Sequence, residues 1–217
     1  MEINIRSEVN DIAEEIVAIR RDIHKHPELG FEVHRTAELV SNHLKKLGFN
    51  VSDGIGKTGV VGDLIGNSDG PTIGLRADMD ALPIQETSNL PYSSVNKGIM
   101  HACGHDGHTA MLLGAATVLK QFQDKINGKV RFIFQPAEEG DGGARYMIED
   151  GCLENVDEIY GIHLWNYQKY GEVGVKEGPI LAAADVFSIT IKGVGGHGAA
   201  PQGTVDAILV SAHLITA

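Results

Sequence analysis

The sequence has few cysteines, no long apolar run and no cluster of basic residues. It contains two cysteines, Cys103 and Cys152, in 217 residues. Two are too few for a disulfide framework, which favours a reducing compartment. No run of 18 apolar residues occurs and the first residues lack the apolar core of a secretory signal, so we expect no membrane span.

The formal net charge is −11. Nucleic acid is not an expected partner either, because phosphate binding relies on clustered lysine and arginine. The default expectation is a cytoplasmic protein.

The remaining composition is that of a globular protein, with 42% hydrophobic and 22% charged residues. Apolar residues at helical spacing predict helices over 7–26, 35–49 and 109–126. Short runs rich in Val, Ile and Leu predict strands over 58–66, 72–80, 128–136 and 157–165, with a helix-like stretch over 142–153. Because strands and helices alternate, the sequence predicts an α/β domain over residues 1–183, with a mostly parallel sheet flanked by helices.

The texture of the sequence changes at residue 184. Residues 185–201 alternate in apolar character and end in a glycine-rich stretch, which predicts a strand, and residues 204–217 predict a helix. A strand and a helix are too little for an independent domain. We therefore expect residues 184–217 to begin a second domain, and the sequence to be part of a longer one.

Metal-ligand residue types gather in "GIMHACGHDGHTAM", residues 98–111, where one eight-residue stretch holds three histidines, a cysteine and an aspartate. Similar residues follow the predicted strands. In open α/β sheets, ligands bind outside the carboxyl ends of the strands. The groups expected at that edge are Asp78, Asp80, Cys103, His105, Glu138, Glu139 and His163.

This set of side chains suits a metal centre. Imidazole, carboxylate and thiolate together suit a first-row divalent ion such as Zn, Mn, Co or Ni. Cys103 and His105 are two residues apart, so on an extended loop they point to the same side. Glu138 and Glu139 are adjacent, so their side chains should diverge, and one can bind metal while the other holds the attacking water. In a two-metal site the ions lie roughly 3.5–4 Å apart and share that water.

Each candidate also has a structural alternative. Two adjacent glutamates are commonly a solvated surface, and a single histidine such as His163 is commonly a buried or loop residue with its polar atoms satisfied. Asp78 and Asp80 fit either a supporting role beside the site or a turn or helix cap.

The other histidines and cysteines leave alternatives open as well. His101 and His108 are not both expected to bind metal, since at least one fits a cap, a supporting residue or a surface position. Cys152 is expected to be a buried structural cysteine. A rival enzyme reading makes Cys103 a nucleophile with His105 as its base.

Six stretches in order resemble one known family, the metallo-amidohydrolases related to aminoacylase and dimetal carboxypeptidases. The similarity is greatest to the subgroup of hippurate hydrolase, bacterial N-acyl-amino-acid amidohydrolases and plant auxin-conjugate hydrolases. It covers essentially the whole chain. The stretches are "HKHPELGFEVHRTAELVSNHLKKLGFNV", "GLRADMDALPIQE", "MHACGHDGHTAMLLGAA", "FIFQPAEEGDGGA", "GIHLW" and "GVGGHGAAP".

The resemblance implies a zinc-peptidase-like catalytic domain, followed by the first strand and helix of an α+β, ferredoxin-like lid or dimerisation domain. It implies two divalent metal ions in a complete site. Glu138 would be the general base, and His197 would contact the substrate near the scissile carbonyl or its carboxylate. The implied metal ligands are Cys103, His105, Glu139 and His163.

Two departures from the family pattern accompany the resemblance. Asp80 aligns with an aspartate that orients a histidine ligand in other branches, but Asp78 holds that histidine's place, so both aspartates are expected to support the site. The family also has a final histidine ligand near the carboxyl end of a chain nearly twice as long. His213, in the last predicted helix, is a poor substitute.

The activity implied by the resemblance is hydrolysis of small N-acyl amino acids to a carboxylate and a free amino acid. Dimerisation through the lid domain is implied too. The alternative for this chain is a metal-binding fragment without turnover.

Overall fold

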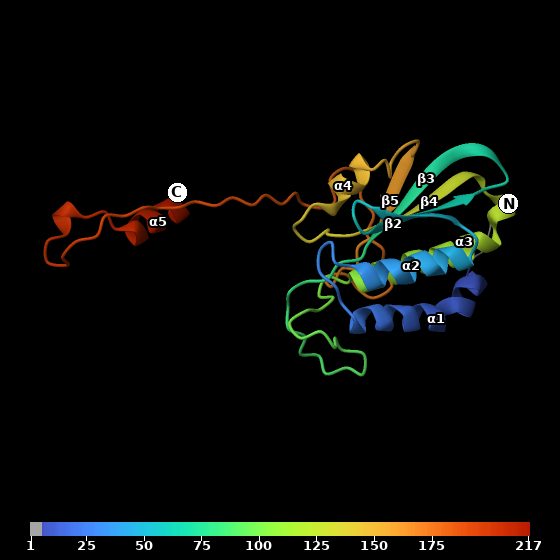
Figure 1. The fold of residues 1–217 in the computed structure, drawn as a ribbon, viewed down its shortest axis with the longest axis horizontal. Helices are drawn as coiled ribbons and strands as arrows, with labels where there is room; N and C mark the ends of the chain where they lie inside the picture. Colours follow the sequence, from blue (N-terminus) through green and yellow to red (C-terminus); the bar gives the residue numbers. More distant parts are fainter. Residues whose placement is uncertain (1–5) are drawn as a thin grey trace. The chain divides into compact units, whose positions relative to one another are not determined.

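The computed structural model describes residues 6–217. These residues divide into two compact units, a first unit that ends at Tyr167 and a second unit, Gln168–Ala217. The first unit contains the sheet and four of the α-helices (Figure 1). The domain boundary expected between residues 183 and 184 stays a prediction, because residues 168–183 form no helix or strand that would assign them to either domain.

The first unit is built on a five-stranded sheet, which confirms the predicted α/β fold class. The strands are β1 (Asn50–Ile55), β2 (Gly59–Ile65), β3 (Ser68–Asp78), β4 (Asn127–Gln135) and β5 (Glu158–Gly161), in the spatial order β1-β2-β4-β3-β5. Strand β3 runs parallel to β4 and β5, whereas β2 is antiparallel to both β4 and β1. Strand β1 was not predicted, because most of its residues are exposed and it carries little apolar alternation.

The register of the parallel strands aligns their carboxyl ends. Asp78, the last residue of β3, lies opposite Gln135, the last residue of β4. Arg76 lies opposite Gly161, where β5 ends. The segments that leave β3, β4 and β5 therefore start side by side at one edge of the sheet.

Helices cover both faces of the sheet (Figure 1). One face is covered by α2 (His34–Lys46) and α3 (His105–Gln121), and α1 (Arg6–Lys25) packs on α3. The short helix α4 (Gly143–Glu149) covers the other face, where its Met147 packs with Ile133 and Cys152. Cys152 is 6% exposed, which confirms it as a buried structural cysteine. The main core combines α2, α3 and sheet residues, among them Leu44, Leu113, Phe132 and Phe134.

The loop between α1 and α2 fastens two of the strand ends. The carbonyl oxygen of Glu28 accepts a hydrogen bond from Ala81 N at 2.8 Å, and that of Gly30 accepts one from Ala137 N at 3.0 Å. The Glu28 carboxylate meanwhile accepts from the backbone of Thr36 at 2.8 Å and so caps the start of α2. One loop thus ties α2 to the segments that follow β3 and β4.

The second unit contains α5 (Ala207–Thr216), in the place predicted for a helix. The Asp206 side chain caps α5 by accepting hydrogen bonds from Ile208 N and Leu209 N. The strand expected at the start of 185–201 does not form, and Val194 and Val205 make one isolated bridge instead. A strand requires a hydrogen-bonded neighbour, which the described residues do not supply to this segment. In the described part of the chain, no helix combines the length and apolar character that crossing a bilayer requires.

Candidate metal centre

Seven of the eight predicted site residues lie together at the carboxyl edge of the parallel strands. The eighth, His197, belongs to the second unit, where it is exposed and its Nδ1 accepts a hydrogen bond from Ala199 N at 3.2 Å. The seven come from four segments: the ends of β3 and β4, the start of α3, and the stretch after β5. They are Asp78, Asp80, Cys103, His105, Glu138, Glu139 and His163.

His105 lies at the centre of this group and is fully buried, with 0% exposure. Neither of its ring nitrogens has a hydrogen-bond partner. Its Nδ1 lies 3.6 Å from Asp80 Oδ1, a distance too long for a hydrogen bond. Its Nε2 faces three carboxylates, with Asp78 at 3.6 Å and Glu138 and Glu139 each at 3.8 Å. A buried imidazole with two unsatisfied nitrogens among carboxylates requires a partner between them.

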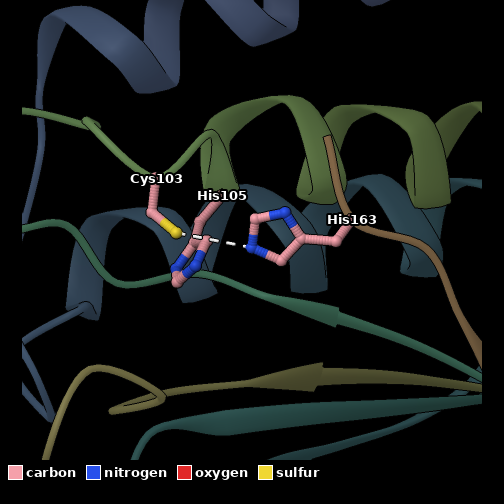
Figure 2. A group of neighbouring side chains, drawn as sticks. All are labelled: Cys103, His105 and His163. Carbon is pink, nitrogen blue, oxygen red and sulfur yellow. Dashed lines mark hydrogen bonds between the residues drawn. The ribbon is translucent and has the colours of Figure 1, made fainter. Parts of the chain in front are cut away.

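Cys103 and His163 face each other beside His105 (Figure 2). The Cys103 thiol lies 3.4 Å from His163 Nε2. The other nitrogen of His163, Nδ1, donates a hydrogen bond to the backbone oxygen of Leu164 at 2.6 Å. Because Nδ1 carries the proton, Nε2 keeps its lone pair, and this is the tautomer that binds a metal.

Two glycines allow this convergence. Gly104 has φ +90°, in the left-handed region that glycine adopts without strain, so the chain turns sharply between Cys103 and His105. At Gly107, in the first turn of α3, a Cβ atom would lie 2.6 Å from Leu164 Cδ1. The absent side chain lets the segment carrying His163 pack against the start of α3.

Asp80 holds the two glutamates through their backbone. Its Oδ1 accepts from Glu138 N at 2.9 Å and its Oδ2 accepts from Glu139 N at 3.0 Å. The preceding Ala137 has φ +52°, which bends the chain after β4. The expectation that adjacent glutamates diverge is wrong here, because both carboxylates lie 3.8 Å from the same nitrogen of His105.

Asp78 is held between a cation and an imidazole. Arg76 Nη1 donates to its Oδ2 at 2.6 Å, and His108 Nδ1 donates to its Oδ1 at 2.6 Å. Burial opposes ionisation of Asp78, but these donors outweigh it and lower its pKa to about 2. The other nitrogen of His108 accepts a hydrogen bond from Leu164 N at 2.9 Å. Both ring nitrogens of His108 are therefore hydrogen-bonded, which fits the supporting role that the sequence analysis left open for this residue.

Burial and negative charge together shape the ionisation of the central groups. Burial disfavours a charge on His105, but the carboxylates of Asp80, Asp78 and Glu138 outweigh it and raise its pKa. Burial raises the pKa of Glu138, and the neighbouring carboxylates of Glu139 and Asp78 add to the effect. Burial, together with the Glu139 carboxylate, raises the pKa of the Cys103 thiol to about 12.

The donor set fits divalent metal ions. Two groups of side chains place one free ligand atom each within 4.8 Å of one another: Cys103 with His105 and His163, and His105 with Glu138 and Glu139. Asp78, His105 and His108 are equally close, but both nitrogens of His108 are already hydrogen-bonded. A cation would satisfy one of the unpaired nitrogens of His105 and reduce the repulsion between the carboxylates. The protonated thiol of Cys103 is a poor nucleophile in this environment, which argues against the cysteine-hydrolase alternative.

A buried polar network beside the centre was missed by the sequence reasoning. It links His24 in α1 to Asp106 in α3 and to Glu86 in the loop after β3, and His101 lies next to it. These residues occur within stretches that look like solvated polar positions of an amphipathic helix or a loop, so the sequence offered no signal beyond the histidine-rich motif itself.

Comparison with known proteins shows one family. The profile described as "Peptidase family M20/M25/M40" matches residues 74–213. Thermostable carboxypeptidase 2 of Saccharolobus solfataricus is 48% identical over 216 residues, covering 98% of this chain and 55% of the relative. N-acyl-L-amino acid amidohydrolase of Geobacillus stearothermophilus is 46% identical over 213 residues, covering 98% of this chain and 58% of the relative.

A solved structure of the same kind matches the fold. The Bacillus subtilis YXEP protein, described as a dinuclear metal binding peptidase from the M20 family, has a TM-score of 0.76 and 46% identity. The match covers 78% of this chain and 48% of that protein. The chain thus spans about half the length of the relatives it matches.

Proposed function

The chain belongs to peptidase family M20/M25/M40, and from this premise we propose that it contributes to a metal-dependent amidohydrolase that cleaves N-acyl amino acids. The observation that carries the proposal is the buried His105 with two unpaired nitrogens, enclosed by a thiol, a second imidazole and four carboxylates. The name of a relative at 46% identity, an N-acyl-L-amino acid amidohydrolase, supports the substrate class.

We assign Cys103, His105, Glu139 and His163 as metal ligands. Two divalent ions in the complete site, of Zn, Mn, Co or Ni, match both the donor types and the dinuclear description of the YXEP protein. Such ions, when bound, polarise the scissile carbonyl and lower the pKa of the attacking water. The four ligands would hold these ions at the carboxyl edge of the parallel strands.

Glu138 is the general base in this proposal. Its side chain is 41% exposed, more than that of Glu139 at 26%, so its carboxylate is the more accessible of the two to water. Its raised pKa suits a group that must first accept a proton from water and then return it to the leaving amine nitrogen. The hydrogen bond from Glu138 N to Asp80 fixes the backbone of this base.

The products are a carboxylic acid and a free amino acid. His197 is proposed to contact the substrate near the carbonyl or the carboxylate, and residues 184–217 are proposed to begin a lid domain through which two copies associate. A small-molecule substrate and a cytoplasmic location complete the proposal.

Two isosteric variants test the roles of the adjacent glutamates in the whole protein that contains this chain. Glu138→Gln should lower turnover of N-acetyl amino acids and hippurate about 100-fold or more while leaving the metal content unchanged, since general bases contribute roughly 10²–10⁴-fold. Glu139→Gln should lower the metal content itself, measured by elemental mass spectrometry. Substantial turnover in Glu138→Gln, or loss of metal in that variant, would overturn the assignment.

The same measurements separate the alternatives. Metal bound by the 217-residue chain alone, without turnover, would indicate that this chain is a metal-binding fragment. Turnover that survives chelation but not thiol alkylation would indicate Cys103 as a nucleophile.

A further inference from the structure

We infer that His24 is a positioning residue of the metal centre, which as an imidazolium bridges Asp106 and Glu86 and so fixes the segment that carries Cys103 and His105. The inference rests on the proposed metal site, but none of the residues that carry it belongs to the predicted ligand set. It concerns the network of Arg20, His24, Glu86 and Asp106, hereafter the His24 bridge.

One side of the His24 bridge anchors the first turn of α3. His24 Nδ1 lies 2.8 Å from Asp106 Oδ2, and Arg20 Nε lies 2.7 Å from the same oxygen. Asp106 is 0% exposed and directly follows His105. Two donors from α1 therefore hold the residue next to the central imidazole.

The other side anchors the loop between β3 and α3. His24 Nε2 lies 3.2 Å from Glu86 Oε1. The second carboxylate oxygen of Glu86 accepts from Ser94 N at 2.6 Å, and the Ser88 hydroxyl also donates to Glu86. Val95 N donates to the carbonyl oxygen of Lys25 at 2.9 Å, so the loop is fastened to the end of α1 at two neighbouring points.

The geometry requires a charged imidazole at position 24. Both ring nitrogens face a carboxylate oxygen, and a neutral ring would direct a lone pair at one of them. The hydrogen bond to Asp106 raises the pKa of His24, against the opposing effect of burial. The other groups against the ring are Arg20, Tyr92 and His101. Arg20 Nη2 lies 3.4 Å from His24 Nδ1, and its positive charge opposes a charge on the ring. The Tyr92 ring meets it edge-on at 5.7 Å, and the His101 ring lies at 6.4 Å. Burial lowers the pKa of His101 to about 4, so it stays neutral.

Cys103 lies between the two anchored points. The chain leaves the Glu86–Ser94 anchor, passes Met100, whose backbone pairs with Leu82, turns at Gly104 and enters α3 at the Asp106 anchor. Without the imidazolium, two buried carboxylates lose their shared countercharge, Asp106 keeps only its ion pair with Arg20, and Glu86 loses its contact with α1, so the segment between them is held less firmly. The thiol of Cys103 and the ring of His105 would then lose their fixed separation.

Cobalt binding tests the inference, because a cobalt–thiolate absorption band reports Cys103 directly. In the whole protein, His24→Gln should weaken Co²⁺ binding about 10–100-fold, the range that supporting residues of metal sites contribute. It should also lower the thiolate band per bound ion. His43→Gln is the matched control, since His43 bonds α3 at Thr117 with a single 2.9 Å contact away from the centre. The Co²⁺ affinity of His43→Gln should stay within about twofold of that of the wild type, because His43 does not support the metal centre.

Glu86→Gln provides a second variant in case His24→Gln fails to fold, because it keeps the hydrogen-bonding shape and removes one charge. Like His24→Gln, Glu86→Gln should weaken Co²⁺ binding and lower the thiolate band per bound ion. Wild-type affinity and an unchanged band in both folded variants, or in Glu86→Gln if only that variant folds, would overturn the inference while leaving the proposed function intact. Absence of Co²⁺ binding by the wild-type protein would overturn the proposed function and the inference together. The two failures are therefore distinguished by whether the wild-type protein binds Co²⁺.

Discussion

Replacing His108 with leucine should destabilise the first unit through the loss of two specific hydrogen bonds. The imidazole is 2% exposed and donates to Asp78 at 2.6 Å while accepting from Leu164 N at 2.9 Å. A hydrogen bond to a charged group contributes about 1.5–3 kcal/mol and a neutral one about 0.5–1.5 kcal/mol. Leucine has similar volume, so little cavity is left. His108→Leu should therefore lower the free energy of unfolding by about 2–4 kcal/mol.

Urea unfolding of the metal-free protein measures this loss without a contribution from bound ions. His43→Leu is the control, because that half-buried imidazole makes one hydrogen bond, to Thr117 at 2.9 Å, and it should cost about 0.5–1.5 kcal/mol. If His108→Leu costs no more than His43→Leu, then the two-bond account of His108 is refuted.

Three further predictions concern charge, backbone and ligand type. Asp63 makes a two-point ion pair with Arg131 at 2.8 and 2.9 Å, so Asp63→Asn should cost about 1–3 kcal/mol near pH 7. Burial favours the neutral form of Asp63, but Arg131 outweighs burial and lowers the folded-state pKa of Asp63. The stability from this ion pair is therefore present above the unfolded-state pKa and is lost as pH falls through the folded-state pKa. Urea unfolding of Asp63→Asn and wild type near pH 7 and near pH 3 measures this change, and an equal cost at both pH values would contradict the prediction. Gly104→Ala should cost about 1–2 kcal/mol, because alanine is strained at φ +90°, and a melting temperature equal to wild type would contradict this. Cys103→Ser should weaken Zn²⁺ binding more than Mn²⁺ binding in competition titrations, because thiolate prefers the softer ion.

The strand ends were predictable because they depend on a simple rule of sheet topology. Asp78, Glu138 and His163 each follow a short apolar run, and parallel strands bring such positions to one edge. The start of α3 was harder to predict from the sequence. It begins at His105 rather than at Thr109, because its first turn buries polar residues that an apolar periodicity does not register.

Other features depend on contacts that no local pattern encodes. The antiparallel pairing of β2 with β4 follows from the packing of the whole sheet, and the exposed edge strand β1 has little apolar alternation. His24 looks like one polar position of an amphipathic helix, yet it is 4% exposed because its partners Asp106 and Glu86 arrive from residues 82 and 62 positions away. Long-range polar pairing of this kind is invisible to single-sequence reasoning.

Burial is the largest cause of the raised pKa of Glu138 and of Cys103, whereas it opposes the raised pKa of His105; the negative charge of neighbouring carboxylates raises all three. Four carboxylates lie within 3.6–3.8 Å of the His105 nitrogens, and burial raises the energy of each negative charge. The negative charge therefore favours the protonated forms of His105, Glu138 and Cys103, whereas Asp78 stays ionised because Arg76 and His108 donate hydrogen bonds to it. A divalent cation would relieve the same repulsion that the protons relieve, so protons and metal compete for these side chains. The folded protein therefore carries an electrostatic cost at this site, and its removal by a bound cation would favour metal binding.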